Sequence, residues 1–452
     1  MEEGTDKIKI LILGGGFAGI SALQQMEKTF GNNVQTTLVS EDNFFLFTPM
    51  LPEMASGTIH PSDISIPIRK FCKRSKFVQA KISSIDLKSR LVAITRTFDG
   101  RVKVLGYDYL IIALGGTTNF FGNKRIEGNS FTMKTIQDAI AIKNHVIHML
   151  EIADGEEDQK AQEKLLTTVV VGAGFAGVET IGEINDFVRE SVRHYYHNIR
   201  PENIKTVLVS GSAGILPELD PKLSQKALES LQKAGVRIIT KTKAVDAGED
   251  YVFLGTGETI PCATMIWTAG LTTDSVIATL DCEHKSGKIL VDEFLRIPGN
   301  PNVFSFGDCA AIKDKKTGGF YPPTAQHALR ESKIVAHNIR CIITKKGVQK
   351  PFNFESKGMM AIVGKRNGIA TISGHNFSGT IAWLIWKTYY LTMLPTFEKK
   401  FKVAIDWTVN LFFKRDITLV RKIKKKSMGK MDVDDINSID QLLFKAEQAP
   451  EQ

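Results

Sequence analysis

Short apolar runs and amphipathic stretches alternate along most of this 452-residue chain. Helices are expected where apolar residues recur every three or four positions, and buried strands where they form short runs. Because strands that alternate with helices form parallel sheets covered by helices, the pattern predicts an α/β fold of two or three domains. The predicted strands are 7–14, 34–40, 205–214 and 236–240, and the predicted helices are 17–30, 135–153 and 221–234.

One glycine pattern occurs twice, each time between a predicted strand and a predicted helix. GAGFAG covers 172–177 and GGGFAG covers 14–19. In such a turn the first glycine allows the tight bend, the second lets a pyrophosphate approach the backbone, and the third lets helix and strand pack closely. The phosphate lies at the positive end of the helix. Two copies predict two nucleotides, one that stays bound and one that is exchanged.

Neither domain has an acidic residue at the end of its second strand, where one usually binds the ribose hydroxyls. In the first domain Ser40 takes that place and Glu41 follows, so Glu41 is either a ribose ligand or the start of a turn. In the second domain Ser210 takes the place, and no arginine lies immediately beside it to bind a 2′-phosphate. The sequence leaves the identity of the exchanged nucleotide open.

Other predicted strands end in small residues that let the backbone pass close to a nucleotide. The run 107–116 ends in Gly115 and Gly116, and the run 303–312 contains Asp308 directly after Gly307. Asp308 either binds the ribityl chain of a flavin or caps a helix; beside two glycine patterns, we favour the flavin. The apolar, proline-rich segment 44–70 is expected to pack against the flavin, with an ordinary buried loop as the alternative.

The positive charge of the chain is concentrated near its C-terminus. The net charge is +9, and Lys387 to Lys430 holds twelve Lys and Arg against three acids, so a nucleic-acid surface elsewhere is poorly supported. Tryptophan beside lysine on an amphipathic helix is typical of a membrane interface, with a dimer interface or ordinary core as the alternative. The apolar positions are Ile381, Leu384, Ile385, Leu391, Leu394, Phe401, Ile405, Leu411 and Phe412, flanked by Lys399, Lys400, Lys402, Lys414 and Arg415.

The remaining composition points to a peripheral membrane protein on the cytoplasmic side. No run reaches the roughly 18 apolar residues of a spanning helix, and the first residues lead from charges directly into a strand, without a secretory leader. The five cysteines form no CxxC pair, so neither a disulfide framework nor a metal site is expected. From Ser427 the tail is polar and acidic, and we expect it to be flexible.

Together these parts resemble the flavoproteins with two dinucleotide domains, and among them the type II NADH dehydrogenases, which are single-subunit NADH:quinone oxidoreductases that do not pump protons. The resemblance runs from Lys7 to Val420. It implies that a hydride passes from NADH to FAD, that two electrons then pass to a membrane quinone, and that the protein is a homodimer. The matching motifs are LGGGFAG, FTPMLPEMASG, VVGAGFAGVET, MIWTAGL, FSFGDCA, PPTAQHALRES and KGMMAIVG.

The resemblance also assigns roles by position. Glu179 would serve as a proton relay or positioning group near nicotinamide and quinone; otherwise it is only a carboxylate stabilised by its helix dipole. The quinone helix of the family reads AQxxxQ, and Arg330 replaces its second glutamine. The expected catalytic residues are Glu179, Gln326 and Arg330. The expected cofactor-binding residues are Gly14, Gly16, Phe17, Ala18, Gly19, Glu41, Pro49, Gly115, Gly307, Asp308, Ala325 and Gln326 around FAD; Gly172, Gly174, Gly177, Glu179, Ser210, Ala269 and Gly270 around NADH or NADPH; and Lys357 in KGMMAIVG.

The predicted architecture is therefore two Rossmann-like domains of the glutathione reductase type, followed by an amphipathic helical membrane-binding segment. The FAD domain would comprise 1–135 and 285–345, and the NAD(P)H domain 136–284. The membrane domain would comprise 346–426, with residues 380–426 making the contacts with the membrane, and a tail would follow at 427–452. Three alternatives remain: an enzyme like sulfide:quinone oxidoreductase, whose redox cysteine motifs are missing here, an NADPH-dependent flavoprotein, and a non-enzymatic flavin-bound redox sensor.

Overall fold

The predicted α/β architecture is confirmed by the computed structural model, which describes residues 7–356 and 358–419. Of these, residues 7–356 and 358–417 form one compact unit. A second unit begins at Thr418, and only Thr418 and Leu419 of it are described. The predicted tail at 427–452 lies outside the described residues.

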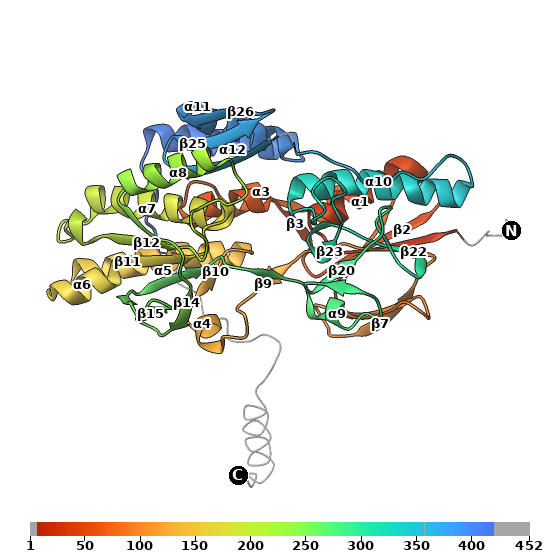
Figure 1. Cartoon of the computed structure of the whole chain (residues 1–452), viewed down its shortest axis with the longest axis horizontal. Helices are drawn as coiled ribbons and strands as arrows, with labels where there is room; N and C mark the ends of the chain where they lie inside the picture. Colours follow the sequence, from red (N-terminus) through yellow and green to blue (C-terminus); the bar gives the residue numbers. More distant parts are fainter. Residues whose placement is uncertain (1–6, 357, 420–452) are drawn as a thin grey trace, which may run out of the picture. The chain divides into compact units, whose positions relative to one another are not determined.

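The first domain is built on an eight-stranded sheet with the order β21-β22-β8-β1-β2-β5-β6-β7. Its central strands are parallel, and a late segment of the chain returns as β22 to pair with β8. Strands β2 and β22 of this sheet lie below helices α1 and α10 in the view of Figure 1. Helices α1 and α10 pack on each other, with the Ser21 and Ser332 hydroxyls 2.6 Å apart. The elements are β1 Lys9–Leu13, α1 Phe17–Phe30, β2 Gln35–Ser40, β5 Lys76–Asp86, β6 Leu91–Arg96, β7 Val102–Gly106, β8 Tyr109–Ile112, β21 Arg296–Ile297, β22 Asn300–Ser305 and α10 Ala325–Thr344.

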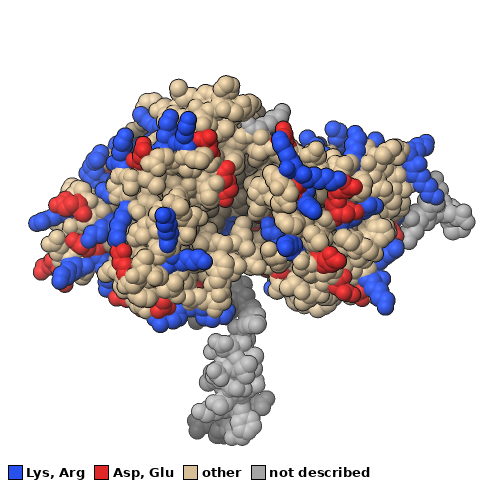
Figure 2. All heavy atoms as spheres, in the orientation of Figure 1, with Lys and Arg blue, Asp and Glu red and all other residues tan. Residues whose placement is uncertain are grey.

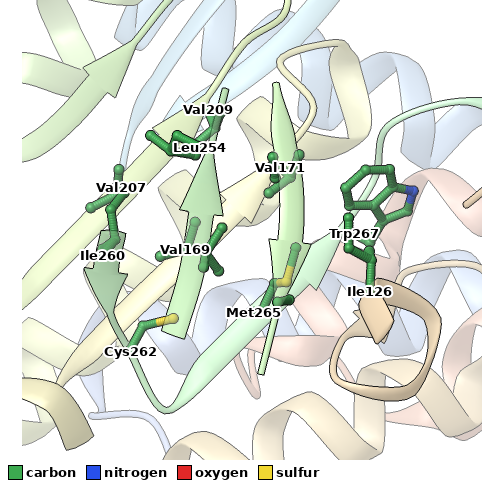
Figure 3. Close-up of a cluster of buried hydrophobic side chains, with 13 residues drawn as sticks. Ile126, Val169, Val171, Val207, Val209, Leu254, Ile260, Cys262, Met265 and Trp267 are labelled. Carbon is green, nitrogen blue, oxygen red and sulfur yellow. The ribbon is translucent and has the colours of Figure 1, made fainter. Parts of the chain in front are cut away.

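The second domain repeats this plan with a five-stranded parallel sheet in the order β10-β17-β11-β12-β13. Valines from β11 and β12 pack with Met265 and Trp267 from β17 in a buried cluster (Figure 3). A small antiparallel sheet, β14-β15-β16, closes one side of that cluster. The elements are β10 Phe131–Thr132, α5 Ile136–Asp154, α6 Gln159–Leu165, β11 Thr167–Val171, α7 Phe175–Tyr195, β12 Lys205–Val209, α8 Pro221–Lys233, β13 Val236–Ile239, β14 Ala244–Ala247, β15 Tyr251–Leu254, β16 Thr259–Pro261 and β17 Thr264–Trp267.

Two connections link these domains and pair with each other. Strand β9 (Thr117–Thr118) lies antiparallel to β18 (Leu271–Thr272). The shorter elements around them are α4 Lys124–Gly128, η3 Pro201–Asn203, α9 Ser275–Ala278, β19 His284–Lys285, β20 Lys288–Leu290, η4 Gly307–Cys309 and β23 Ala310–Ala311.

Segment 44–70 is mostly buried, as its apolar sequence predicts, but it is not a plain loop. Phe45, Phe47 and Met54 are almost fully buried, and short helices lie between two paired strands. The elements are β3 Phe44–Leu46, η1 Thr48–Met50, α2 Leu51–Ala55, α3 Pro61–Ile64, β4 Ser65–Pro67 and η2 Ile68–Lys70.

Several predicted strands are too long at their carboxyl ends. The predicted strand 205–214 ends at Val209, because Ser210 and its glycine-rich successors form a turn. The run 107–116 contributes only β8, and 303–312 breaks after Ser305. Gly115 and Gly307 adopt φ values of 70° and 76°, which strand geometry excludes.

The C-terminal part forms a three-stranded antiparallel sheet and two helices (Figure 1). Strand β24 packs on α7, helix α11 packs on β25, and α12 contacts α3. No helix within residues 7–356 and 358–419 is long and apolar enough to cross a membrane. The elements are β24 Gly358–Gly364, β25 Asn367–Ile372, β26 His375–Gly379, α11 Thr380–Met393 and α12 Phe397–Phe412.

Candidate functional site

The first glycine turn has the geometry of a phosphate cradle. Gly14 has a φ of 109°, and a Cβ there would lie 2.1 Å from the Ala113 carbonyl oxygen. A Cβ on Gly19 would lie 1.8 Å from the Gly14 oxygen, so helix and strand meet at van der Waals limits. Gly16 faces open space and begins α1 without any side-chain cap or first-turn acid. The uncapped N–H groups therefore fit an anionic phosphate.

The second glycine turn repeats these constraints. Gly172 has a φ of 109°, a Cβ on Gly177 would lie 1.7 Å from the Gly172 oxygen, and Gly174 faces open space at the uncapped start of α7. Thr268, which the sequence did not single out, donates its hydroxyl to the Val171 and Gly172 carbonyls at 2.9 and 3.1 Å. The sequence feature that could have identified Thr268 is its position after strand β17, directly before Ala269 and Gly270.

The first cradle is walled by residues from a distant part of the chain. A Cβ on Gly307 would lie 3.0 Å from the Ala18 methyl and 3.9 Å from that of Ala328, so this turn lies between α1 and α10. The Gly307 N–H donates to Glu331 at 2.9 Å, and burial raises the pKa of Glu331 to about 7. Glycines at the close contacts and uncapped helix N–H groups fit FAD here.

The remaining residues predicted around FAD lie in different settings. Phe17 packs edge-on against Phe45, with ring centres 4.9 Å apart, and so joins the glycine turn to segment 44–70. Pro49 lies in the one-turn helix η1 of the same segment. Glu41 is exposed just after β2, and its backbone carbonyl accepts a hydrogen bond from Gln79.

Glu179 is buried where the second nucleotide domain meets the C-terminal part. It lies in the second turn of α7, and one carboxylate oxygen accepts hydrogen bonds from the Ile362 N–H at 3.1 Å and the Trp386 indole at 3.2 Å. Burial outweighs both hydrogen bonds and raises the pKa of Glu179 to about 8. Trp386 also contacts Tyr390, whose ring meets Phe47 of segment 44–70. An aromatic path therefore connects Glu179 with the surroundings of the first cradle.

Gln326 and Arg330 lie on the first turns of α10 and contact the segment that leads into β24. Gln326 donates to the Ser356 hydroxyl at 3.0 Å. Arg330 donates to the Gln326 carbonyl at 2.7 Å and stacks on the Phe354 ring at 4.1 Å. Gln326 thus contacts Ser356, and Glu179 contacts Ile362 in β24, but no direct bond joins Gln326 and Glu179 among the described residues. Ala325 begins the helix beside them, and Lys357 lies outside the described residues.

Four buried charged groups form two ion pairs near Glu179, and the sequence did not predict their pairing. Lys387 of α11 pairs with Glu53 of α2, which also accepts a hydrogen bond from the Trp407 indole at 3.2 Å. Glu183, one turn after Glu179, pairs with Arg415 at 3.0 Å and accepts a hydrogen bond from Ser56 at 2.7 Å. We call Glu53, Glu183, Lys387 and Arg415 the buried quartet. It ties α2, α7, α11 and the end of the C-terminal part together.

The buried quartet corrects one prediction about the C-terminal cations. Arg415 was expected to flank an apolar face, yet it is buried against Glu183. Lys399 was expected there too, and instead it is buried with its ammonium donating to the Ser62 carbonyl. Desolvating a cation is costly unless a partner compensates, so these groups face the protein's own acceptors. Leu394 is also buried rather than part of an outward face.

Ser210 shapes its own loop. Its hydroxyl donates to the Gly214 carbonyl at 2.7 Å and accepts a hydrogen bond from the Ser212 N–H at 3.2 Å. Ser210 is 2% exposed, so the solvent-exposed edge of the loop is formed by Gly211 and Ser212.

Comparisons with known proteins agree with this geometry. A family model described as pyridine nucleotide-disulphide oxidoreductase matches residues 8–332, and the NDH2 C-terminal domain matches 356–416. A probable NADH dehydrogenase of Dictyostelium discoideum is 32% identical over 91% of each chain. A type II NADH:quinone oxidoreductase of Mycobacterium tuberculosis is 30% identical, covering 90% of this chain and 89% of its own.

A solved structure has the same fold. The NDH2 of Plasmodium falciparum, determined in complex with NADH, superposes with a TM-score of 0.84 at 22% identity and covers 91% of this chain and 100% of its own. The two matched domains and the relatives lead to one conclusion: the chain belongs to the type II NADH dehydrogenase family.

Proposed function

We propose that this protein oxidises NADH and reduces a membrane quinone with the help of bound FAD, without pumping protons. The observation that carries the proposal is the position of Glu179, a buried carboxyl that joins the helix of the second glycine turn to Trp386 in the C-terminal part. When bound, FAD would supply the chemistry, accepting a hydride and releasing two electrons.

The two cradles would divide the nucleotides between them. The first cradle, with Gly307 and Asp308 beside its glycines, would hold FAD, since it is enclosed by α1, α10 and segment 44–70. The second cradle, at 172–177, would exchange NADH. The relatives support this division: the M. tuberculosis protein is named an NADH:quinone oxidoreductase, and the P. falciparum structure contains NADH.

Glu179, Gln326 and Arg330 would serve the quinone. A carboxyl with a pKa near 8 is mostly protonated at neutral pH, so Glu179 can deliver one of the two protons that a reduced quinone takes up. Gln326 would donate a hydrogen bond to a quinone carbonyl. Arg330 would stabilise negative charge there, although in this conformation its guanidinium stacks on Phe354.

Helices α11 and α12 would attach the protein to the membrane surface. Ile381, Phe397 and Phe401 are 63%, 82% and 59% exposed. The surface over α11 and β26, at the top of Figure 2, bears few charged side chains, whereas Lys, Arg, Asp and Glu cover the flanks. Such exposed apolar area, with Lys402 and Lys414 at its edge, fits insertion into the interfacial layer of an anionic membrane. The cytoplasmic side and the homodimer remain predictions.

The test separates the two half-reactions in a stopped-flow instrument. NADH should bleach the visible absorbance of the bound flavin, and a soluble quinone should restore it. Bleaching by sulfide instead of NADH would support the sulfide alternative, and no bleaching by any donor would support a redox sensor. A protein that NADH reduces but no quinone reoxidises would contradict the proposal.

A further inference from the structure

The loop that follows β12 has an unusual charge for a site that receives NADH. In dinucleotide domains an acid after the second strand binds the ribose 2′-hydroxyl and repels a 2′-phosphate. Here residues 210–217 contain no acid, and the hydroxyl of Ser210 is used within its own loop. The feature that would exclude NADPH is therefore missing.

Lys241 and Lys243, in the turn that follows strand β13, lie beside this loop. The Lys241 N–H donates to the Ser212 carbonyl at 2.8 Å, and the Thr242 N–H donates to the Ser210 carbonyl at 3.1 Å, so the two turns are fastened together. A Cβ on Gly211 would lie 3.6 Å from Cγ and 3.8 Å from Cε of Lys243. The side chain of Lys243 thus lies along the bare backbone of Gly211, directly after Ser210.

Neither lysine is neutralised. Lys241 and Lys243 are exposed, and no ion pair or side-chain hydrogen bond involves them within residues 7–356 and 358–419. The acid nearest in sequence, Asp246, is paired with Arg125 at 3.2 Å. The edge of the loop after β12, where the ribose would lie, therefore has two ammonium groups without an ion-pair partner and the exposed Ser212 hydroxyl. Ammonium and hydroxyl groups bind phosphate.

We propose that the second nucleotide site accepts NADPH as well as NADH, with Lys243 and Ser212 binding the 2′-phosphate and Lys241 adding positive charge. The inference rests on the proposed function, because it takes the 172–177 cradle as the site of the exchanged nucleotide. A serine alone would only remove the repulsion. The lysines add attraction, and they lie some thirty residues beyond the position where the sequence motif is normally inspected.

Binding of two small probes tests the site without relying on hydride transfer. Isothermal titration calorimetry would compare 2′,5′-ADP with 5′-AMP, which differ only by the 2′-phosphate. We expect 2′,5′-ADP to bind about fivefold more tightly at low salt, and Lys243→Glu to abolish the difference. The control is Lys233→Glu, an exposed lysine at the end of α8 that changes the net charge equally and should preserve it.

The flavin bleaching assay then extends the test to whole nucleotides. NADPH should reduce the flavin with a kcat/KM within about tenfold of that for NADH, and Lys243→Glu should lower only the NADPH value. Equal binding of the two probes, or a Lys243→Glu variant that affects both nucleotides alike, would overturn the inference. Failure of NADH itself to bleach the flavin would overturn the proposed function instead. The probe titration would still show whether the protein binds the 2′-phosphate.

Discussion

Trp386 donates its indole N–H to Glu179 at 3.2 Å, which links the first C-terminal helix to the helix of the second glycine turn. The same carboxylate oxygen accepts the Ile362 N–H. Both hydrogen bonds favour the ionised carboxylate, yet desolvation is stronger and raises the pKa of Glu179 to about 8. The contact therefore holds a protonated carboxyl in place at neutral pH, which is the form that can donate.

The Glu179→Gln variant should change the pH profile of flavin reoxidation by quinone. In the wild type the rate should fall as the pH rises through about 8, because the protonated fraction of Glu179 falls. Glutamine cannot donate a proton, so the variant should be slower by roughly a hundredfold at pH 7 and should lose this decline. Stopped-flow reoxidation measured across the pH range checks both points. Glu229→Gln, an exposed carboxyl on α8, is the control, and an unchanged decline in Glu179→Gln would refute the assignment.

Glu179 should also make the stability of the protein depend on pH. Its pKa is raised in the folded state, so its contribution is fully present below the ordinary value of 4.5 and is lost as the pH rises through about 8. The free energy of unfolding of the wild type should fall relative to Glu179→Gln over this range. Asp186 and Glu331, with pKa values raised to about 6 and 7, add similar losses to both proteins. Urea unfolding at several pH values should therefore be compared as the difference between the two proteins, and a constant difference would contradict the prediction.

Arg415→Leu should destabilise the protein strongly, because it leaves Glu183 buried without its cation. Breaking one partner of a buried pair costs about 3 to 5 kcal/mol. The double variant Glu183→Met with Arg415→Leu should recover most of this loss, since no uncompensated charge then remains. Urea unfolding measures the three proteins.

Lys402→Leu provides the matched control, since Lys402 pairs with Glu398 at the surface and both side chains are 48% exposed. Such a pair contributes no more than about 1 kcal/mol. If Arg415→Leu were no more destabilising than Lys402→Leu, the buried quartet would not hold the C-terminal part in place.

The parts of the molecule that were predictable from sequence are those fixed by local rules. The glycine turns at 14–19 and 172–177 are set by backbone sterics, so spacing alone located both cradles. The direction of Lys399 and Arg415 was not predictable, because their partners lie in segments more than 200 residues away. From sequence alone, a cation within an apolar stretch predicts a membrane-binding surface, and only the fold shows that another part of the protein supplies its acceptor. Lys243 lies only some thirty residues after Ser210, but the backbone hydrogen bonds that bring their two turns together are visible only in the fold.

Gln326→Ala should slow reoxidation of the flavin by quinone more than its reduction by NADH. Loss of one hydrogen bond to the quinone predicts an effect of roughly tenfold on the quinone step. Arg330→Lys is the informative companion, since it keeps the charge and removes the planar stack on Phe354. Both half-reactions are measured by stopped-flow. Equal loss in the two half-reactions of Gln326→Ala would show that this residue supports the fold rather than the quinone.

Membrane attachment should depend on the exposed apolar residues and not on the buried cations. Deleting 380–426 would be uninformative, because it removes Lys387 and Arg415 and leaves Glu53 and Glu183 unpaired. Leu384→Asp and Phe401→Asp change only exposed side chains, and each should weaken binding to anionic vesicles by about tenfold or more, since burying one such side chain contributes about 1.5 to 3 kcal/mol. Phe98→Asp, an exposed phenylalanine in the turn between β6 and β7, is the control. Vesicle flotation measures the binding, and retained flavin shows that each variant is folded. Release of both variants but not of the control supports attachment through α11 and α12. Unchanged flotation of both variants would place the membrane contact elsewhere.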